Sequence, residues 1–255
     1  MNALAELGAI GTLHRGQYIY YTELAFASEI GPYAGAHPPP AASGSQIHIK
    51  SAMLLDMSPD RDLSQVTLED FRREAAGQHP MPAGVAIAAV SASFALGLIA
   101  KVLTVSGRRN TLTGNAAGLE QSVAAAQAAS QRMLQLAGDD VAAFEAYLSA
   151  RRLPHSMESE HQARQQAIDA AIRGIIDVPL AAAREAAAGL QMCSDASAFT
   201  PPSLVADLGV VGALLGSALH AFLLCAESNV RQLAPDAASL RERVATAAQQ
   251  LKRDR

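Results

Sequence analysis

The sequence predicts an all-α protein, an up-and-down bundle of long alanine-rich helices that is expected to be dimeric. From Thr67 onward nearly every segment consists of Ala, Leu, Gln, Glu and Arg, which are strong helix formers. The alternation of β-branched and aromatic residues that is typical of strands is almost missing there. A chain of 255 residues, half of them hydrophobic, is long enough to bury a sizeable core without metals or disulfides.

The first three helices are predicted near 67–77, 84–106 and 114–152. Thr67 followed by Asp70 forms a capping box, which is typical of a helix start. The second helix opens after a Pro-Ala-Gly turn and ends at Gly107, and the stretch "RRLPH" ends the third.

The remaining helices are predicted near 157–177, 180–193, 203–230 and 236–252, because helix-breaking and capping residues lie between these segments. Pro179 in "DVPL" is expected to break or kink the helix before it, because proline has no N–H and clashes with the preceding turn. The stretch "FTPPS" makes a serine the expected N-cap of the next helix.

Residues 1–66 are predicted to be an N-terminal extension, poorly ordered or linker-like, ahead of a helical domain over 67–255. The extension contains "GPYAGAHPPPAASGSQ", which is linker-like in composition. The opening "MNALAELGAIGTLHR" lacks the positive region of a signal peptide. Together with two cysteines that fit reduced, buried thiols, Cys193 and Cys225, this predicts a cytoplasmic location.

Composition also limits the partners. The net charge of −4, the aromatic content of 4% and the absence of Trp argue against nucleic acid as a partner. Val85–Ala100 and Leu208–Ala226 carry no charged residue, so a membrane span is the alternative to a core helix. They lack flanking aromatic belts and are rich in small residues, so we expect a soluble core with no membrane, and a homodimer built on one of them.

An up-and-down count of the predicted helices places polar groups together. Matched helix lengths bring Asp140 back to the level of Gly84, and two further helices would return Asp207 to the same end. Pro82, Ala83 and Gly84 would then open a shared site. Taken singly, each feature has a simpler reading, since Asp207 also suits a helix N-terminus and Pro-Ala-Gly also suits a plain turn.

Five stretches in order resemble the folate cyclodeaminase/cyclohydrolase family, whose members are methenyltetrahydrofolate cyclohydrolases and the C-terminal half of formiminotransferase-cyclodeaminases. The family pattern Pro-x-Pro-Gly-Gly-Gly, closing in Leu-Thr, is matched by "PMPAGV" and a later "LT". The other four stretches are "DDVAAFEAYLSARRLP", "AIDAAIRGIIDVPL", "VADLGVVGALL" and "ESNVRQL". The resemblance covers about residues 67 to 235.

The resemblance implies an enzyme of one-carbon metabolism that hydrolyses 5,10-methenyltetrahydrofolate to 10-formyltetrahydrofolate. The folate is the substrate, and neither a cofactor nor a metal is expected, because the histidines lack ligand spacing. Asp140 and Asp207 are the expected catalytic carboxylates. The expected substrate-binding residues are Pro82, Ala83, Gly84, Tyr147, Arg108, Arg109 and Asn229. The two arginines would belong to a partner subunit and hold the glutamate tail of the folate.

Two alternatives stay open. One is formimidoyltetrahydrofolate cyclodeaminase, an ammonia lyase; the hydrolase is preferred because the sequence carries no transferase segment. The other is a non-catalytic helical dimer that has lost the folate site. Ala83, Gly84 and Val85 stand where the family has three glycines, and the methyl groups of Val85 are expected to obstruct a ligand that touches bare backbone.

Overall fold

The computed structural model describes residues 63–109, 116–233 and 237–253, which all lie within the compact unit Leu55–Arg255. Over these ranges the chain forms six α-helices and two short 3-10 turns, with no strand. The all-α prediction is confirmed. The predicted extension lies outside the described residues except for its end, where the 3-10 turn η2 (Leu63–Gln65) contacts α4.

The first helix, α2 (Leu68–Ala75), begins where the capping box predicts. The Thr67 hydroxyl accepts the Asp70 amide at 3.1 Å and donates to the Asp70 carboxylate at 2.6 Å. Arg72 and Arg73 pair with acids three residues earlier on the exposed surface. Local capping and ion pairs therefore account for this short helix, which has no buried residue.

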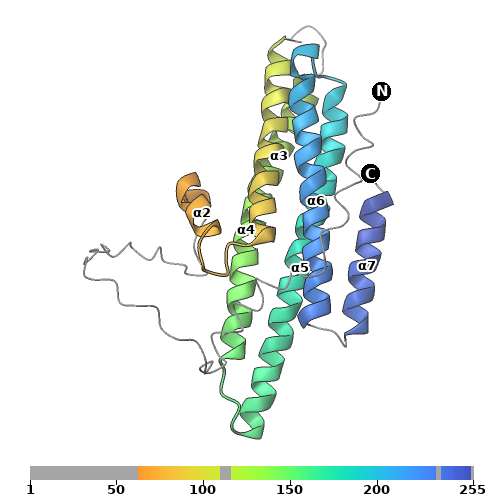
Figure 1. The fold of residues 1–255 in the computed structure, drawn as a ribbon. Helices are drawn as coiled ribbons and strands as arrows, with labels where there is room; N and C mark the ends of the chain where they lie inside the picture. Colours follow the sequence, from red (N-terminus) through yellow and green to blue (C-terminus); the bar gives the residue numbers. More distant parts are fainter. Residues whose placement is uncertain (1–62, 110–115, 234–236, 254–255) are drawn as a thin grey trace, which may run out of the picture. The chain divides into compact units, whose positions relative to one another are not determined.

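Four long helices form the bundle: α3 (Gly84–Arg109), α4 (Ala116–Arg151), α5 (Glu158–Ser197) and α6 (Val205–Leu233). Each packs on its neighbours in the chain, and α3 also packs on α6, which closes the ring. Figure 1 shows successive helices running in opposite directions, as the up-and-down prediction requires. The lower halves of α4 and α5 extend beyond the N-terminus of α3 (Figure 1).

The boundary predicted at Pro179 is wrong, and this changes the topology. The segments predicted as two helices around Pro179 form the single 40-residue helix α5, with Pro179 buried inside it. Proline removes one hydrogen bond of the helix, but its fixed φ angle is compatible with a helix. The packing of the residues before and after Pro179 on the bundle keeps the helix continuous. The chain therefore crosses the bundle once between Glu158 and Ser197, and α6 starts at the opposite end from the one predicted.

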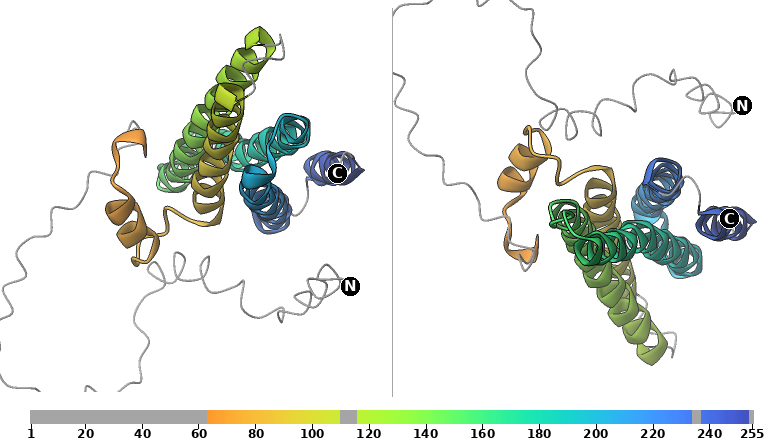
Figure 2. Two further views of the ribbon diagram at one scale, coloured as in Figure 1. Left: turned by 90° about the horizontal axis from the view of Figure 1, so that it is seen from above. Right: turned by 90° about the horizontal axis from the view of Figure 1, so that it is seen from below.

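The chain returns through a 3-10 turn, η3 (Pro202–Leu204), before α6 begins at Val205. Ser203, the predicted N-cap, lies inside this turn. The last helix, α7 (Ala238–Arg253), packs on α6 and α5 and contributes Val244 and Leu251 to the core. Figure 2 shows α7 outside the four-helix ring, beside α6.

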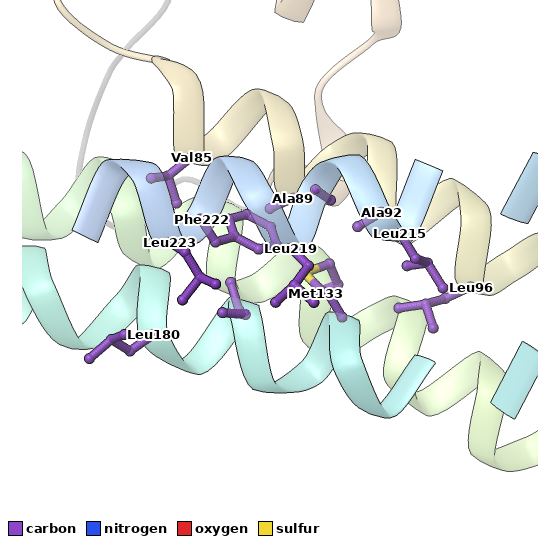
Figure 3. Close-up of a cluster of buried hydrophobic side chains, with 14 of the residues drawn as sticks. Val85, Ala89, Ala92, Leu96, Met133, Leu180, Leu215, Leu219, Phe222 and Leu223 are labelled. Atoms are coloured by element: carbon purple, nitrogen blue, oxygen red, sulfur yellow. The ribbon is translucent and has the colours of Figure 1, made fainter. Parts of the chain in front are cut away.

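Small residues let the helices approach closely. Gly189 of α5 lies where an added Cβ would be 2.7 Å from Leu96 and 3.0 Å from Leu215, so only glycine fits there without repacking. Ser93 and Ser130 donate to each other's backbone carbonyls at 3.0 and 2.8 Å, which joins α3 to α4. Figure 3 shows how the larger side chains fill the space between α3, α5 and α6.

Two helices are long and apolar enough to cross a membrane by length and composition. They are Gly84–Gly107 and Pro202–Arg231; of the most apolar 18-residue window in each, 56% and 39% respectively is buried in the bundle. On α3 the exposed large apolar residues are Ile87 and Phe94, and on α6 they include Val210 and Leu214. Each of these helices therefore has one buried face and one apolar face that the described residues leave uncovered.

Candidate active site

The turn "PMPAG" leads directly into α3 and sets the position of its first amides. Met81 and Pro82 are buried, the peptide bond between them is cis, and Ala83 accepts the Ile87 amide at 3.0 Å as the first carbonyl of the helix. Gly84, the first residue of α3, is exposed. The first amides of a helix have no carbonyl partner in a preceding turn, so they attract an acceptor from elsewhere.

Asp140 of α4 provides that acceptor. The backbone N–H of Ala86 donates to its carboxylate, which places Asp140 at the N-terminus of α3. The side chain is only 8% exposed. Burial raises the pKa of Asp140 to about 7, and the Ala86 hydrogen bond opposes part of that rise. A carboxyl with this pKa holds and releases a proton near neutral pH.

The predicted proximity of Gly84 and Asp140 is thereby confirmed. It followed from matching helix lengths across the first loop of the bundle, and α3 and α4 are continuous as predicted. The neighbouring Asp139 is exposed, although partial burial raises its pKa as well. Only Asp140 faces the helix N-terminus.

Cys225 of α6 forms the other wall of the site. A Cβ added to Gly84 would lie 3.5 Å from the Cys225 Sγ atom. Burial first, and then the charge of Asp140, raise the pKa of this thiol to about 11. The thiol is therefore protonated at physiological pH. Cys225 and Cys193 are both free and half-buried.

Sequence reasoning missed two members of this site, Cys225 and the Ala86 amide. The lengths of the helices carry the signal for Cys225. When α5 is treated as one continuous helix, α6 descends from the far end and reaches the level of Gly84 after about five turns. The backbone amide has no sequence signal of its own beyond its place in the first turn of α3.

Val85 does not obstruct the site, so that expectation is wrong. Its side chain is 4% exposed and belongs to the hydrophobic core. Figure 3 shows it within the same cluster as Phe222 and Leu223. Successive helix residues point about 100° apart, so Val85 faces the core while Gly84 faces outward. The one glycine retained from the family pattern is thus the residue exposed at the site.

Asp207 does not share this site, which corrects the predicted same-end placement. It lies in the first turn of α6, next to Leu208, whose carbonyl is 3.5 Å from the Cys193 Sγ atom near the end of α5. About five helical turns, or roughly 27 Å, separate Asp207 from Cys225 along α6. The error follows from the predicted break at Pro179, which added one crossing of the bundle.

Arg108 and Arg109 end α3, about 37 Å along the helix from Gly84. They lie at the same end of the bundle as Asp207, as the antiparallel packing of α3 and α6 requires. Cations at a helix C-terminus and an acid at a helix N-terminus both complement the helix dipole. Within one chain, none of these three residues reaches Asp140.

Tyr147 lies two turns after Asp140 on α4 and is 8% exposed. Its ring centroid is 6.3 Å from that of Phe144, and the Arg151 guanidinium lies 5.9 Å from the Tyr147 ring. The ring packs against the core cluster. Its predicted contact with substrate therefore requires a ligand that extends from Asp140 along α4.

Asn229 is occupied by a contact within the protein. Its Nδ2 atom donates to the Ile175 carbonyl of α5 at 3.2 Å. Ile175 lies four residues before Pro179, which has no N–H to donate. The two sequence stretches "AIDAAIRGIIDVPL" and "ESNVRQL" are therefore joined by one hydrogen bond.

A separate open groove of about 620 Å³ runs between the lower halves of α4 and α5. Its lining is almost entirely apolar and includes none of Gly84, Asp140 and Cys225. The lining residues are Ala143, Ala146, Ser149, Ala150, Leu153, Ala167, Ala170, Ala171 and Gly174.

Among the described residues, no group of three or more His, Cys, Asp or Glu side chains is arranged to hold a metal ion.

The fold and the site define a class: an all-α bundle with a buried carboxylic acid at the N-terminus of one of its core helices. Residues 67–250 match the family model described as Formiminotransferase-cyclodeaminase, and the chain belongs to this family. The resemblance seen in the five sequence stretches is confirmed.

Individual relatives are distant. The chain is 25% identical over 199 residues to Formimidoyltransferase-cyclodeaminase of Sus scrofa, an alignment that covers 77% of this chain and 37% of that protein. It is 26% identical over 144 residues to Methenyltetrahydrofolate cyclohydrolase of Methylorubrum extorquens, covering 56% of this chain and 69% of that one. The chain thus spans little more than a third of the length of the pig protein.

A solved structure supports the fold. The chain matches the crystal structure of formiminotetrahydrofolate cyclodeaminase from Thermotoga maritima with a TM-score of 0.65 and 18% identity, covering 75% of this chain and 90% of that one. At this identity the match establishes the shared helical bundle.

Proposed function

We propose that this protein hydrolyses 5,10-methenyltetrahydrofolate to 10-formyltetrahydrofolate, with Asp140 as the general base. The observation that carries the proposal is the buried Asp140 carboxyl at the N-terminus of α3, with its pKa raised to about 7. The relative named a cyclohydrolase supports the choice of reaction, because the chain covers 69% of its length.

The chemistry suits a single carboxylate. The substrate carries a cationic one-carbon bridge between N5 and N10, and ionised Asp140 stabilises that charge. The carboxylate takes a proton from water as the oxygen attacks the bridge carbon. The adduct collapses: the bond from carbon to N5 breaks, N5 receives a proton, and the second proton of the water leaves as the formyl carbonyl forms. One proton is released to solvent, which balances the positive charge of the substrate.

The backbone around Gly84 supplies the contact surface. Gly84 is exposed and has no side chain, so a ligand can lie against the start of α3, bounded by Asp140 and Cys225. Amides at a helix N-terminus suit polar oxygens of a pterin. Asp207, Arg108 and Arg109 can take part only from a partner subunit, because they lie at the opposite end of their own chain.

A direct assay tests the proposal. Purified full-length protein is given 5,10-methenyltetrahydrofolate, and its loss and the appearance of 10-formyltetrahydrofolate are followed. Asp140→Asn should lower kcat/KM by roughly 10²–10⁴-fold, the usual contribution of a positioned general base. Asp139→Asn, on the exposed neighbour, is the control and should stay within a few-fold of wild type. Turnover that survives Asp140→Asn would refute the assignment of the base.

The second candidate reaction is the cyclodeamination of formimidoyltetrahydrofolate. It is favoured by the alignment of 199 residues with the pig Formimidoyltransferase-cyclodeaminase. The same acid, once protonated, can transfer its proton to a departing ammonia. Measuring ammonia released from formimidoyltetrahydrofolate in parallel decides between the two reactions.

The third candidate is a non-catalytic protein, an alternative that rests on the altered glycine turn; of the two changed residues, Val85 points into the core and Ala83 remains beside Gly84. It predicts no turnover of either folate and no binding by calorimetry.

We further infer that the protein is a soluble, cytoplasmic homodimer that needs no cofactor. The uncovered apolar faces of α3 and α6, with Phe94 57% and Val210 50% exposed, support association of two copies. Extraction without detergent and a dimeric mass by light scattering are the expected results. A monomer at all concentrations would contradict the dimer, and extraction only with detergent would instead support a membrane location.

A further inference from the structure

The Ile175 carbonyl is the feature that connects α5 to α6 near the site. Pro179 follows four residues later inside the same helix and has no N–H, so this carbonyl lacks its usual helical donor. Ile175 is 5% exposed and Pro179 is buried. A buried carbonyl without a partner is destabilising, and the Asn229 amide donates to it at 3.2 Å.

The position of Asn229 relates this bond to the site. Asn229 lies four residues after Cys225 on α6, one helical turn further along the same face. Cys225 in turn forms the wall beside Gly84 and lies within the field of Asp140. A bond that fixes Asn229 against α5 therefore also fixes the height and rotation of α6 where Cys225 meets α3.

We propose that Asn229 is a positioning residue, and that Asn229 and Pro179 together form a latch that holds α6 against α5 and so keeps Cys225 in place at Gly84. Pro179 frees the carbonyl and Asn229 uses it. In a helix without the proline, the amide of residue 179 would compete for that carbonyl and pull it back toward the helix axis. The latch itself does not depend on the reaction; its effect on substrate rests on the proposed function.

The latch predicts a specific pattern in a double-mutant cycle on the full chain. Asn229→Ala should lower the melting temperature by roughly 3–8 °C, because it leaves a buried carbonyl unpaired. In the Pro179→Ala background the same change should cost less than half as much, because the amide of Ala at 179 then serves the carbonyl. Val230→Ala, a buried neighbour on α6, is the control and should cost the same in both backgrounds. If Asn229→Ala fails to fold, Asn229→Leu, which is similar in size and has no donor, gives the same comparison in the Pro179→Ala background.

A second measurement reports on position rather than stability. In a Cys193→Ser background, iodoacetamide should alkylate Cys225 about tenfold faster after Asn229→Ala, the factor that corresponds to losing about 1.4 kcal/mol of local stability. Pro179→Ala alone should also speed alkylation, although it strengthens α5, and the double variant should be no faster than Asn229→Ala. If Asn229 only stabilised the fold and did not depend on Pro179, Pro179→Ala would not speed the alkylation of Cys225.

The outcomes separate the latch from direct substrate contact. The latch predicts that both single variants raise KM for 5,10-methenyltetrahydrofolate and that their effects are not additive. If Asn229→Ala raises KM equally in both backgrounds while Pro179→Ala leaves alkylation unchanged, the latch is refuted in favour of a direct contact. An equal loss of melting temperature in both backgrounds also refutes it. If no folate is turned over, the proposed function fails, but the melting and alkylation comparisons still decide the latch.

Discussion

Replacing Asp140 by Asn should stabilise the protein at alkaline pH and not at acid pH. The folded protein holds the Asp140 proton up to about pH 7, whereas an exposed aspartate releases it near pH 3.8. Between these values the folded state binds more protons than the unfolded state, so stability falls as the pH rises through that window. Above about pH 7 the folded protein carries the full cost of a buried charge.

The size of the effect follows from the same two values. At about 1.36 kcal/mol for each pH unit between 3.8 and about 7, ionised Asp140 lowers the free energy of unfolding at pH 8 by on the order of 4 kcal/mol. Asn keeps an acceptor for the Ala86 amide and buries no charge, but its own NH₂ group needs a partner. We therefore expect Asp140→Asn to raise the melting temperature by roughly 5–10 °C at pH 8.

Thermal unfolding of both proteins between pH 4.5 and pH 8.5 is the assay. Near pH 4.5 the wild-type carboxyl is already neutral, so the advantage of the variant should vanish. Asp139→Asn is the matched control, because the more exposed Asp139 should give a smaller change over the same range. A difference between wild type and Asp140→Asn that stays constant with pH would show that Asp140 does not titrate near neutrality in the folded protein.

Four further predictions concern the surroundings of this carboxyl. Gly84→Ala should leave the melting temperature nearly unchanged, because the new Cβ meets Cys225 Sγ at an ordinary 3.5 Å, yet it should weaken folate binding about tenfold or more by calorimetry. Val85→Gly should lower the free energy of unfolding by about 2–4 kcal/mol in a denaturant titration and gain no folate affinity; tighter binding would revive the idea of a blocked site. Asp140→Asn should speed alkylation of Cys225 above pH 8, because removing the charge of Asp140 lowers the pKa of the thiol; an unchanged rate would place the two groups too far apart to interact. Deleting residues 1–60 should leave the melting temperature within a few degrees, as their linker-like composition suggests, and a larger loss would show that they pack on the bundle.

How far the sequence predicts this molecule depends on which feature is read. Helix content, the cap at Thr67 and the start of α3 at Gly84 follow from propensity and local sequence signals, and the structure confirms them. The predicted end of α3 at Gly107 is wrong, because the helix continues through this glycine to Arg109. The meeting of Gly84 and Asp140 also follows, because it requires only two continuous helices of matched length joined by one loop. Local sequence signals and the lengths of two neighbouring helices were therefore sufficient to predict the α3 and α4 side of the site.

The prediction of the α6 side of the site failed because of one residue, Pro179. Proline in the middle of a helix costs about 3 kcal/mol by propensity, so a break at Pro179 is the favoured local prediction. Tertiary packing overrides it: Pro179 and Leu180 are buried within the bundle, and the carbonyl that the proline frees is used by Asn229. No local pattern contains the partner of that carbonyl, which lies 54 positions away in the chain. Because of the helix break predicted at Pro179, Asp207 was predicted at the Gly84 end of the bundle, although it lies at the opposite end. For the same reason Cys225, which does lie at the Gly84 end, was not predicted as part of the site.

The energetics of Asp140 give a reason to expect chemistry at this site rather than structure alone. Its carboxyl satisfies the Ala86 amide, but a neutral Asn or Ser could do so without a buried charge. At neutral pH the acid therefore destabilises the fold where a neutral cap would not. A site that holds a proton donor and acceptor at this cost is typical of catalytic machinery, in which the pKa is matched to the working pH. This reasoning predicts that kcat/KM for the folate substrate rises with pH and levels off above about pH 7, as the base in the free protein ionises. The stability of the wild-type protein should fall over that same interval. If the rate profile and the stability profile were to break at different pH values, the group that titrates in the fold would not be the group that performs the reaction.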